Sequence, residues 1–173
     1  MINKIKTIIL VVVCLFFSST TIYSQHNDEH NKTESHDHFS KHHIALFNGA
    51  TTNFSHKSTA YTVGLDYEFR FSRLVGCGIS GEYIASESGE ILAGIGVFLH
   101  PYKGTKLIAG PFLILAEEAH SEDHESKKEA SISFRIGVGY DFHFKMLSVG
   151  PIVNFDVGNT EAINYGLAIG IAL

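Results

Sequence analysis

Hydrophobic and polar residues alternate one by one along most of the chain after residue 44. The clearest run covers residues 61–71, where Tyr, Val, Leu and Phe occupy every second position. The same pattern recurs over residues 131–144 and again over residues 163–173. A period of two places successive side chains on opposite faces of a strand, so each run predicts a strand with one apolar face. The pattern predicts an all-β protein.

Weaker alternation fills the intervening residues and gives eight candidate strands. We place them at residues 42–51, 59–71, 74–86, 91–100, 105–117, 130–144, 146–156 and 161–173. Every second connection is a tight turn, and the others are mostly longer and more polar. Short turns at one end and longer loops at the other are typical of transmembrane barrels. We therefore predict an eight-stranded antiparallel up-and-down transmembrane β-barrel over residues 44–173.

The alternation does not by itself say which face of the sheet is inside. A soluble barrel of the lipocalin type would line a ligand cavity with its apolar face. Its exterior would be about 25–35% charged, yet the polar face of the last run is Asn164, Gly166, Ala168, Gly170 and Ala172. Small residues suit the crowded lumen of an eight-stranded barrel. This composition favours the transmembrane barrel, with its bulky apolar face toward lipid.

Two Gly-Pro pairs fall inside predicted strands. They are Gly110-Pro111 and Gly150-Pro151. Proline has no backbone N–H to donate to the neighbouring strand. We predict a bulge or kink at each.

The first 24 residues have the composition of a secretory signal peptide. Lys4 and Lys6 supply a positive start, residues 8–17 are apolar and uncharged, and small polar residues lead to Ser24. An apolar run of about ten residues is shorter than the ~20 that a membrane-spanning helix needs. We predict export, with residues 1–24 removed.

Residues 25–43 form a separate compositional block. They are rich in histidine and acidic residues and nearly free of hydrophobic ones, so we predict a disordered periplasmic tail. Neutral imidazole binds Zn, Cu and Ni, which makes this tail a candidate for weak metal binding. The candidate ligands are His26, His30, His36, His38, His42 and His43. Their spacing is irregular, so a hydrophilic spacer that binds no metal is the competing hypothesis, and no other cofactor is expected.

Charge excludes one class of function. The chain has 13 Lys and Arg against 18 Asp and Glu, a net charge of −5 at neutral pH. A nucleic-acid-binding domain would carry a basic face. We therefore expect no nucleic-acid partner.

The C-terminal pattern carries a family resemblance. Tyr165, Leu167, Ile169, Ile171 and Leu173 alternate back from the last residue. This resembles the assembly signal of small eight-stranded outer-membrane barrels of Gram-negative bacteria, of the OmpA transmembrane-domain, OmpX and OmpW type, although that family usually ends in Phe. The resemblance covers about residues 44–173. It implies location in the outer membrane, contact with its lipid and with the barrel-assembly machinery, and a monomer.

Several charged residues fall on the inward parity of the predicted strands. In a narrow lumen they must be paired, because an isolated buried charge is costly. The predicted lumen network is Asp66, Glu68, Arg70, Glu82, His100, Arg135, Asp141 and His143. We interpret it as a salt-bridged core that fills the barrel. The alternative is a proton or small-ion path through His100 and His143.

No residues have the pattern of a catalytic site, and none is assigned. Ser121 follows His120 in the longest loop, where adjacent residues fix no geometry between nucleophile and base. No Gly-x-Ser-x-Gly motif occurs. We predict a non-enzymatic outer-membrane protein of structural or interaction type. The alternative is a metal-responsive barrel that binds Zn, Cu or Ni through its tail.

Overall fold

The computed structural model describes residues 40–117, 128–159 and 161–173, which form an antiparallel β-sheet. None of these residues belongs to a helix long and apolar enough to span a membrane. The expected signal peptide and most of the His-rich segment lie outside the described residues. The strands are β1 (His42–Asn53), β2 (Ser58–Arg70), β3 (Val75–Ile84), β4 (Glu90–Leu99), β5 (Thr105–Glu117), β6 (Lys128–Tyr140), β7 (Phe142–Phe144), β8 (Leu147–Gly158) and β9 (Ala162–Ala172).

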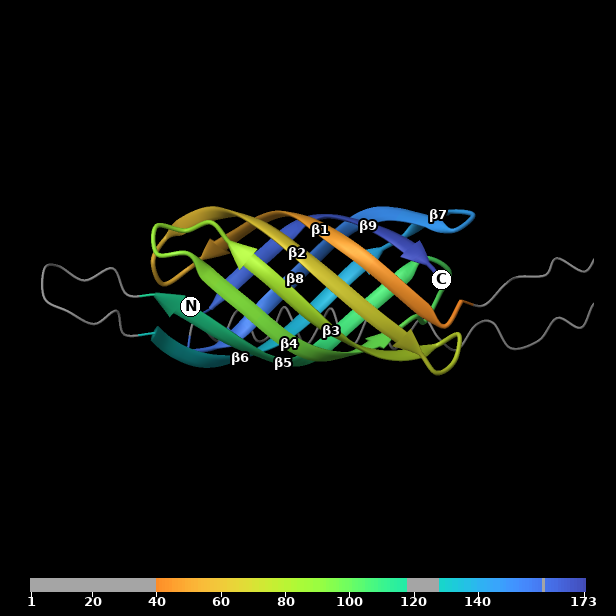
Figure 1. Cartoon of the computed structure of the whole chain (residues 1–173), viewed down its shortest axis with the longest axis horizontal. Helices are drawn as coiled ribbons and strands as arrows, with labels where there is room; N and C mark the ends of the chain where they lie inside the picture. Colours follow the sequence, from red (N-terminus) through yellow and green to blue (C-terminus); the bar gives the residue numbers. More distant parts are fainter. Residues whose placement is uncertain (1–39, 118–127, 160) are drawn as a thin grey trace, which may run out of the picture. The chain divides into compact units, whose positions relative to one another are not determined.

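The sheet closes on itself into a barrel. Strands that follow one another in sequence pair with each other, except that β6 and β7 both pair with β8, and the first strand also pairs with the last. The closing ladder between β1 and β9 runs from the His43–Ala172 pair to the Asn53–Ala162 pair. Figure 1 shows the tilted strands wrapping around one axis. The antiparallel up-and-down barrel predicted from the sequence is therefore confirmed.

Segments β6 and β7 act as one strand of an eight-stranded barrel. Gly139 pairs with Ile152 of β8, and Phe142 pairs with Val149 in the same register. The interruption between the two segments lies opposite Pro151. Because the register is unchanged across the gap, Pro151 inserts no bulge.

Pro111 interrupts its ladder in the same way. Gly94 pairs with Phe112 on one side of it, and Val97 pairs with Ala109 on the other, without a change of register. The missing N–H of proline removes pairing locally but adds no extra residue. The predicted bulge is absent at both positions.

The start of β1 and the end of β9 lie at the same end of the barrel. The Leu173 N–H donates to the His42 carbonyl over 2.8 Å. The tight turns after β2, β4 and β7 lie at this end, which we call the turn end (Figure 1). The opposite end, which carries the connections after β1, β3, β5 and β8, we call the loop end.

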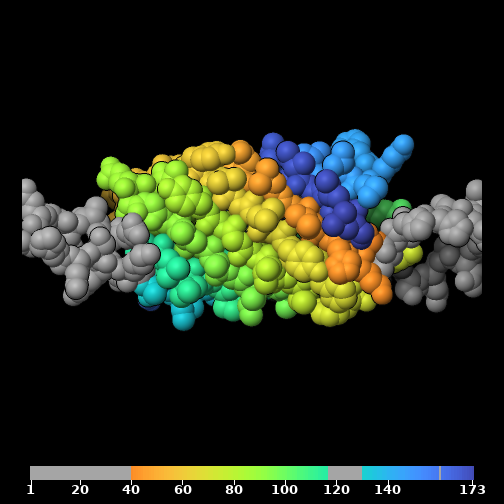
Figure 2. Space-filling view, in the orientation of Figure 1, coloured from red at the N-terminus to blue at the C-terminus, as the bar shows by residue number. Residues whose placement is uncertain are grey.

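The two faces of the barrel wall have opposite compositions. Large hydrophobic side chains cover the outside, and at its centre they are about half exposed: Leu65 57%, Ile79 59%, Ile95 61%, Ile136 54% and Leu167 53%. Charged and hydroxyl side chains on the alternate positions are buried in the lumen. Figure 2 shows the outer surface over β1 to β4, where the side chains form a continuous wall. The prediction that hydrophobic positions face outward and the alternate polar positions face the lumen is confirmed for these strands.

The start of β1 agrees with the predicted strand at residues 42–51 and lies before the boundary at residue 44 that composition indicated. His42 and His43 belong to β1 rather than to the preceding segment. The imidazole Nδ1 of His42 is 2.8 Å from the Tyr67 hydroxyl on the outer face. His43 is buried in the lumen. Both residues are therefore removed from the predicted tail, because strand pairing extends to them.

Candidate functional site

The lumen holds a buried ion-pair network centred on Arg135. This side chain projects inward from β6 and is 2% exposed. Its Nε and Nη2 donate to the two carboxylate oxygens of Asp156 over 2.7 and 2.8 Å. Its Nη2 also donates to Glu82 over 3.0 Å, and its Nη1 donates to the second oxygen of Glu82. One guanidinium thus holds two carboxylates from β3 and β8 in a bidentate arrangement with each.

Polar side chains from four further positions extend this network across the barrel. The Asn164 Nδ2 donates to Glu82 over 3.2 Å and to the Thr51 hydroxyl over 3.1 Å. Thr51 in turn lies 2.7 Å from the Thr62 hydroxyl. Asn154 donates to the Asn164 side-chain oxygen over 3.1 Å. The network therefore links β1, β2, β3, β6, β8 and β9 and stabilises the closed barrel.

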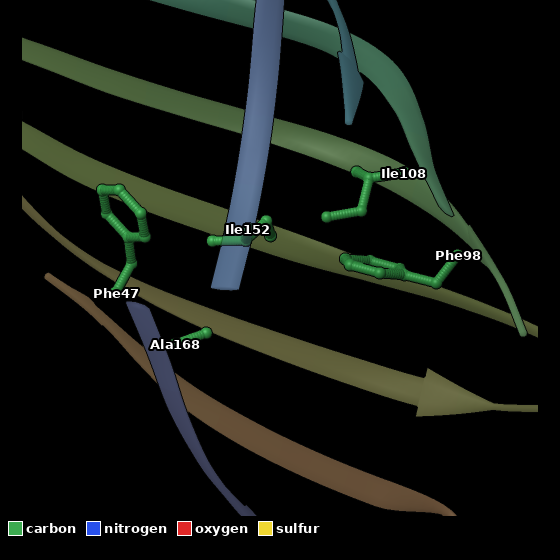
Figure 3. Packing of buried hydrophobic residues seen from close by; sticks show 5 residues of the cluster. All are labelled: Phe47, Phe98, Ile108, Ile152 and Ala168. Carbon is green, nitrogen blue, oxygen red and sulfur yellow. The ribbon is translucent and has the colours of Figure 1, made fainter. Parts of the chain in front are cut away.

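An apolar cluster fills the lumen on the turn-end side of Arg135. Figure 3 shows its side chains converging from strands on different sides of the barrel. The members are Phe47, Phe98, Ile108, Ile152 and Ala168. We call this group the apolar plug. Buried aliphatic and aromatic side chains pack at the density of organic crystals, so a filled cluster of this kind leaves little space for water.

A second apolar cluster packs on the loop-end side of Arg135. It contains Ile84, Leu92, Phe112 and Ile114. The Phe112 ring lies against the guanidinium, with the Arg135 carbon 4.2 Å from the ring centroid. Room for this ring comes from Gly94, where a Cβ would lie 2.5 Å from a Phe112 ring carbon. The ion pairs are therefore enclosed between two apolar layers.

The turn-end mouth carries a second group of charged residues. Glu68 is buried, and its Oε1 lies 2.6 Å from His100 Nε2. The Arg70 Nε donates to the same oxygen over 3.1 Å. Nearby strands contribute Lys106 and Asp141, whose charged atoms are 3.8 Å apart. These pairs face the apolar plug from the side opposite to Arg135.

Most of the sequence-predicted lumen residues lie where the parity places them. Glu68, Glu82, Arg135 and Asp141 are buried, and Arg70 and His100 are partly buried. Asp66 is also partly buried, but its side chain has no hydrogen bond or ion pair within the described part of the chain. The network is divided: Glu82 and Arg135 belong to the central group, and Glu68, Arg70 and His100 to the mouth.

The placement of His143 in the lumen is wrong. Its parity is inward, but β7 extends past the end of the barrel, and the side chain is exposed. Among the described strands, β7 pairs only with β8, so no strand pairs with His143 on its other side. His100 and His143 therefore do not line one path through the barrel.

Two buried polar groups were missed by the sequence analysis. Lys106 lies on the inward parity of its predicted strand, so the periodic pattern contains the signal for it. The contact of His43 with Ser148, 3.0 Å between Nε2 and the hydroxyl, joins residues far apart in sequence, and no local pattern signals it. Both side chains of this pair are buried. A Ser–His pair shut inside the lumen is inaccessible to a substrate, so we assign it a structural role.

Metal-ligating residues do not gather in the part of the chain that the structure describes. No group of three or more His, Cys, Asp or Glu side chains is arranged to hold an ion there. The candidate ligands His26, His30, His36 and His38 lie outside the described residues. His42 and His43 are already engaged by Tyr67 and Ser148.

The described loops at the loop end border an open pocket of about 720 Å³. Its sides come from the connections after β1, β3 and β8 and from the adjoining strand ends. Below it, a small cavity of about 20 Å³ extends to Asp156 of the Arg135 network. The lumen therefore has a hollow outer mouth above a packed interior.

Comparison with solved structures identifies the fold. The N-terminal β-barrel domain of Pseudomonas aeruginosa OprF matches with a TM-score of 0.56 and 13% identity, covering 76% of this chain and 97% of that one. Ail, the attachment invasion locus protein of Yersinia pestis, matches in a phospholipid bilayer nanodisc with a TM-score of 0.55 and 11% identity, over 77% and 99% of the two chains. Its complex with the heparin analogue sucrose octasulfate matches with a TM-score of 0.51 and 14% identity, over 78% and 97%.

Sequence comparison adds nothing to this structural likeness. No protein-family model and no curated protein matches the chain. The structural matches establish the architecture of the small outer-membrane barrels and, at such low identity, the architecture alone.

Proposed function

We propose that this chain is an outer-membrane β-barrel of structural or interaction type, with a side-chain-filled lumen and no enzymatic activity. One observation carries the proposal: large hydrophobic side chains are exposed around the wall, while charges are buried and paired inside. In water, a barrel with its hydrophobic side chains outside and its charges inside would expose a large apolar surface. In a bilayer the same surface meets hydrocarbon, which makes it stable.

The ends of the barrel suggest an orientation. Outer-membrane barrels have short periplasmic turns and longer external loops. By that rule the turn end faces the periplasm, together with both barrel termini and the His-rich tail. The loop end then faces outward and offers the surface for partners. We expect a monomer surrounded by outer-membrane lipid, inserted by the barrel-assembly machinery.

Cell fractionation tests the location. We expect the full chain in the outer-membrane fraction, with gel mobility that changes on heating because the folded barrel resists detergent. Recovery from the soluble periplasm would contradict the proposal.

Planar-bilayer recordings test the filled lumen separately. The apolar plug and the Arg135 network both block the axis, so we expect no discrete openings. Openings of uniform size that persist in independent preparations would overturn this part of the proposal and leave the membrane location intact.

The loop end of this chain does not favour a polyanionic partner. Ail has been solved with a heparin analogue. Among the described residues of this chain, the pocket at the loop end is lined by Glu87 and Glu90 and by no lysine or arginine. A sulfated sugar would be repelled there. We therefore propose an interaction role without extending that ligand to this chain.

A second candidate function is metal binding by the His-rich tail. The four histidines His26, His30, His36 and His38 supply imidazole ligands for Zn, Cu or Ni. Zinc titration of the purified chain tests this, with these four residues replaced by Asn and with His56→Asn in a loop as the control. We expect the fourfold variant to lose most bound zinc and the control to lose little. Equal stoichiometry in all three proteins would refute the tail as the binder.

A further inference from the structure

The pocket at the loop end has a lining that suits hydrogen bonding to a ligand. Hydroxyl, carboxamide and carboxylate side chains surround it, over a floor that includes Ala60 and Ile114. Its polar side chains include Asn53, His56, Ser58, Glu87, Glu90 and Ser131. The volume of about 720 Å³ falls within the ~300–1,000 Å³ typical of small-molecule sites. It is far larger than a single metal ion requires.

One side of the pocket is held by the connection between β1 and β2. The Asn53 side-chain oxygen accepts hydrogen bonds from the backbone N–H groups of Ser55 and His56, at 2.9 and 3.1 Å. The Phe54 N–H donates to the Glu161 carbonyl over 3.0 Å, which joins this turn to the connection before β9. This side is therefore formed before any ligand arrives.

Another side is a tight turn between β3 and β4. The Gly89 N–H donates to the Ser86 carbonyl over 3.1 Å, and Gly89 has a φ of 64°, which favours glycine. The Ser86 hydroxyl donates to the Glu90 carboxylate over 3.1 Å. That bond fixes Glu90 at the pocket wall. Preorganised polar groups lose less entropy when a ligand binds.

The charge of the pocket lining is one-sided among the residues that the structure describes. Glu87 and Glu90 belong to that lining and no described lysine or arginine does, since Lys57 of the neighbouring turn lies outside it. Beneath them, Asp156 and Glu82 share the single guanidinium of Arg135, so one negative charge there has no cationic counterpart within that group. A cleft lined by one sign of charge concentrates ligands of the opposite sign.

We propose that this pocket binds a small amine that carries several hydroxyl groups, of the amino-sugar class. The ammonium pairs with Glu90 or Glu87 at the wall. The ligand hydroxyls exchange hydrogen bonds with side chains such as Ser58 and Ser131. The inference adds a ligand class to the interaction role and concerns only the purified barrel, so a negative result leaves the proposed location and filled lumen untouched.

Calorimetric titration of the refolded full chain in detergent tests the ligand class. The probes are glucosamine, its neutral counterpart N-acetylglucosamine, the acidic sugar glucuronate, and calcium chloride. We expect saturable binding of glucosamine, weaker binding of N-acetylglucosamine by about threefold to tenfold, and none of glucuronate. Equal binding of the three sugars, or saturable binding of calcium without any of glucosamine, would overturn the proposal.

Two isosteric variants locate the site. Glu90→Gln removes a charge from the pocket and keeps an oxygen that accepts from Ser86. Glu161→Gln removes the same charge from the same end of the barrel but lies outside the pocket lining. We expect the first to weaken glucosamine binding by about threefold to tenfold and the second by less than about twofold. Equal losses would show a diffuse charge effect and refute the site; unchanged heat-dependent gel mobility confirms folding in each variant.

Discussion

Neighbouring residues of β6 occupy two regions that follow opposite rules. Ile136 lies on the outer wall and is 54% exposed, while Arg135 lies in the lumen and is 2% exposed. On the wall, an apolar side chain is satisfied by contact with hydrocarbon. In the lumen, a charged side chain is satisfied only by partners that the fold brings to it, here Glu82 and Asp156.

The two regions therefore differ in how readily they accept substitutions. A wall position needs only to be apolar, because lipid adapts its shape to whichever side chain it meets. A lumen position needs a matching partner and a matching volume, because neighbouring side chains leave no room to adjust. A charge placed on the wall, or a charge left unpaired in the lumen, is therefore expected to lower the free energy of unfolding strongly. A substitution that changes only side-chain volume should lower it more in the lumen than on the wall.

Removing the charge at the centre of the lumen should have the largest effect. Arg135→Met leaves Glu82 and Asp156 buried without a cation. We expect the free energy of unfolding to fall by about 3–5 kcal/mol, measured by urea denaturation in lipid vesicles. Adding Glu82→Gln and Asp156→Asn to Arg135→Met should recover most of that loss, because no uncompensated charge then remains. A loss below about 1 kcal/mol in the single variant would show that the ion pairs are not needed.

Placing a charge on the wall should have the next largest effect. Ile136→Arg puts a guanidinium in hydrocarbon, and we expect a loss of about 2–4 kcal/mol near the bilayer midplane. Ile171→Arg, close to the turn end, is the matched control and should cost about 0–1 kcal/mol. The same vesicle denaturation measures both. Equal costs at the two positions would contradict the proposed placement of the wall in the membrane.

A change of one methylene group should separate the regions by packing alone. Ile108→Val opens a gap in the apolar plug and should lower the free energy of unfolding by about 0.5–1.5 kcal/mol. Ile95→Val on the wall leaves a space that lipid can fill, so we expect a smaller loss. If the wall variant lost as much stability as the plug variant, lipid would not be filling the gap.

The turn-end mouth should show the smallest effect of charge removal. Arg70 is partly exposed, and Glu68 keeps His100 as a second partner. We expect Arg70→Ala to cost less than about 2 kcal/mol, since the buried Glu68 carboxylate keeps His100 as a partner. Raised salt should shrink this difference further and leave the Arg135→Met loss nearly unchanged. A loss above about 2 kcal/mol that does not change with salt would show that the ion pairs of the mouth behave like the central ion pairs of Arg135.

The strands and the facing of most side chains could be predicted from the sequence. A period of two is a local property, so residues 61–71 and 131–140 reveal the strand and its two faces without any knowledge of neighbours. The same parity identified Glu82 and Arg135 as inward residues. It misplaced His143 because parity says nothing about where a strand extends beyond the barrel. Composition assigned His42 and His43 to the tail although the predicted strand at residues 42–51 included them, because composition does not show that β2 pairs with both residues.

The alternation along the chain determined the class of fold and the number of strands, because both depend only on residues next to one another. The small, uncharged residues of the polar face then indicated which face is turned to lipid. The contacts between residues on different strands depend on how the barrel closes. Closure selected Glu82 and Asp156 as joint partners of Arg135, assembled the apolar plug from five strands, and shaped the pocket from separate turns. Those contacts depend on strand tilt and register, which fix distances between residues that are far apart in the sequence.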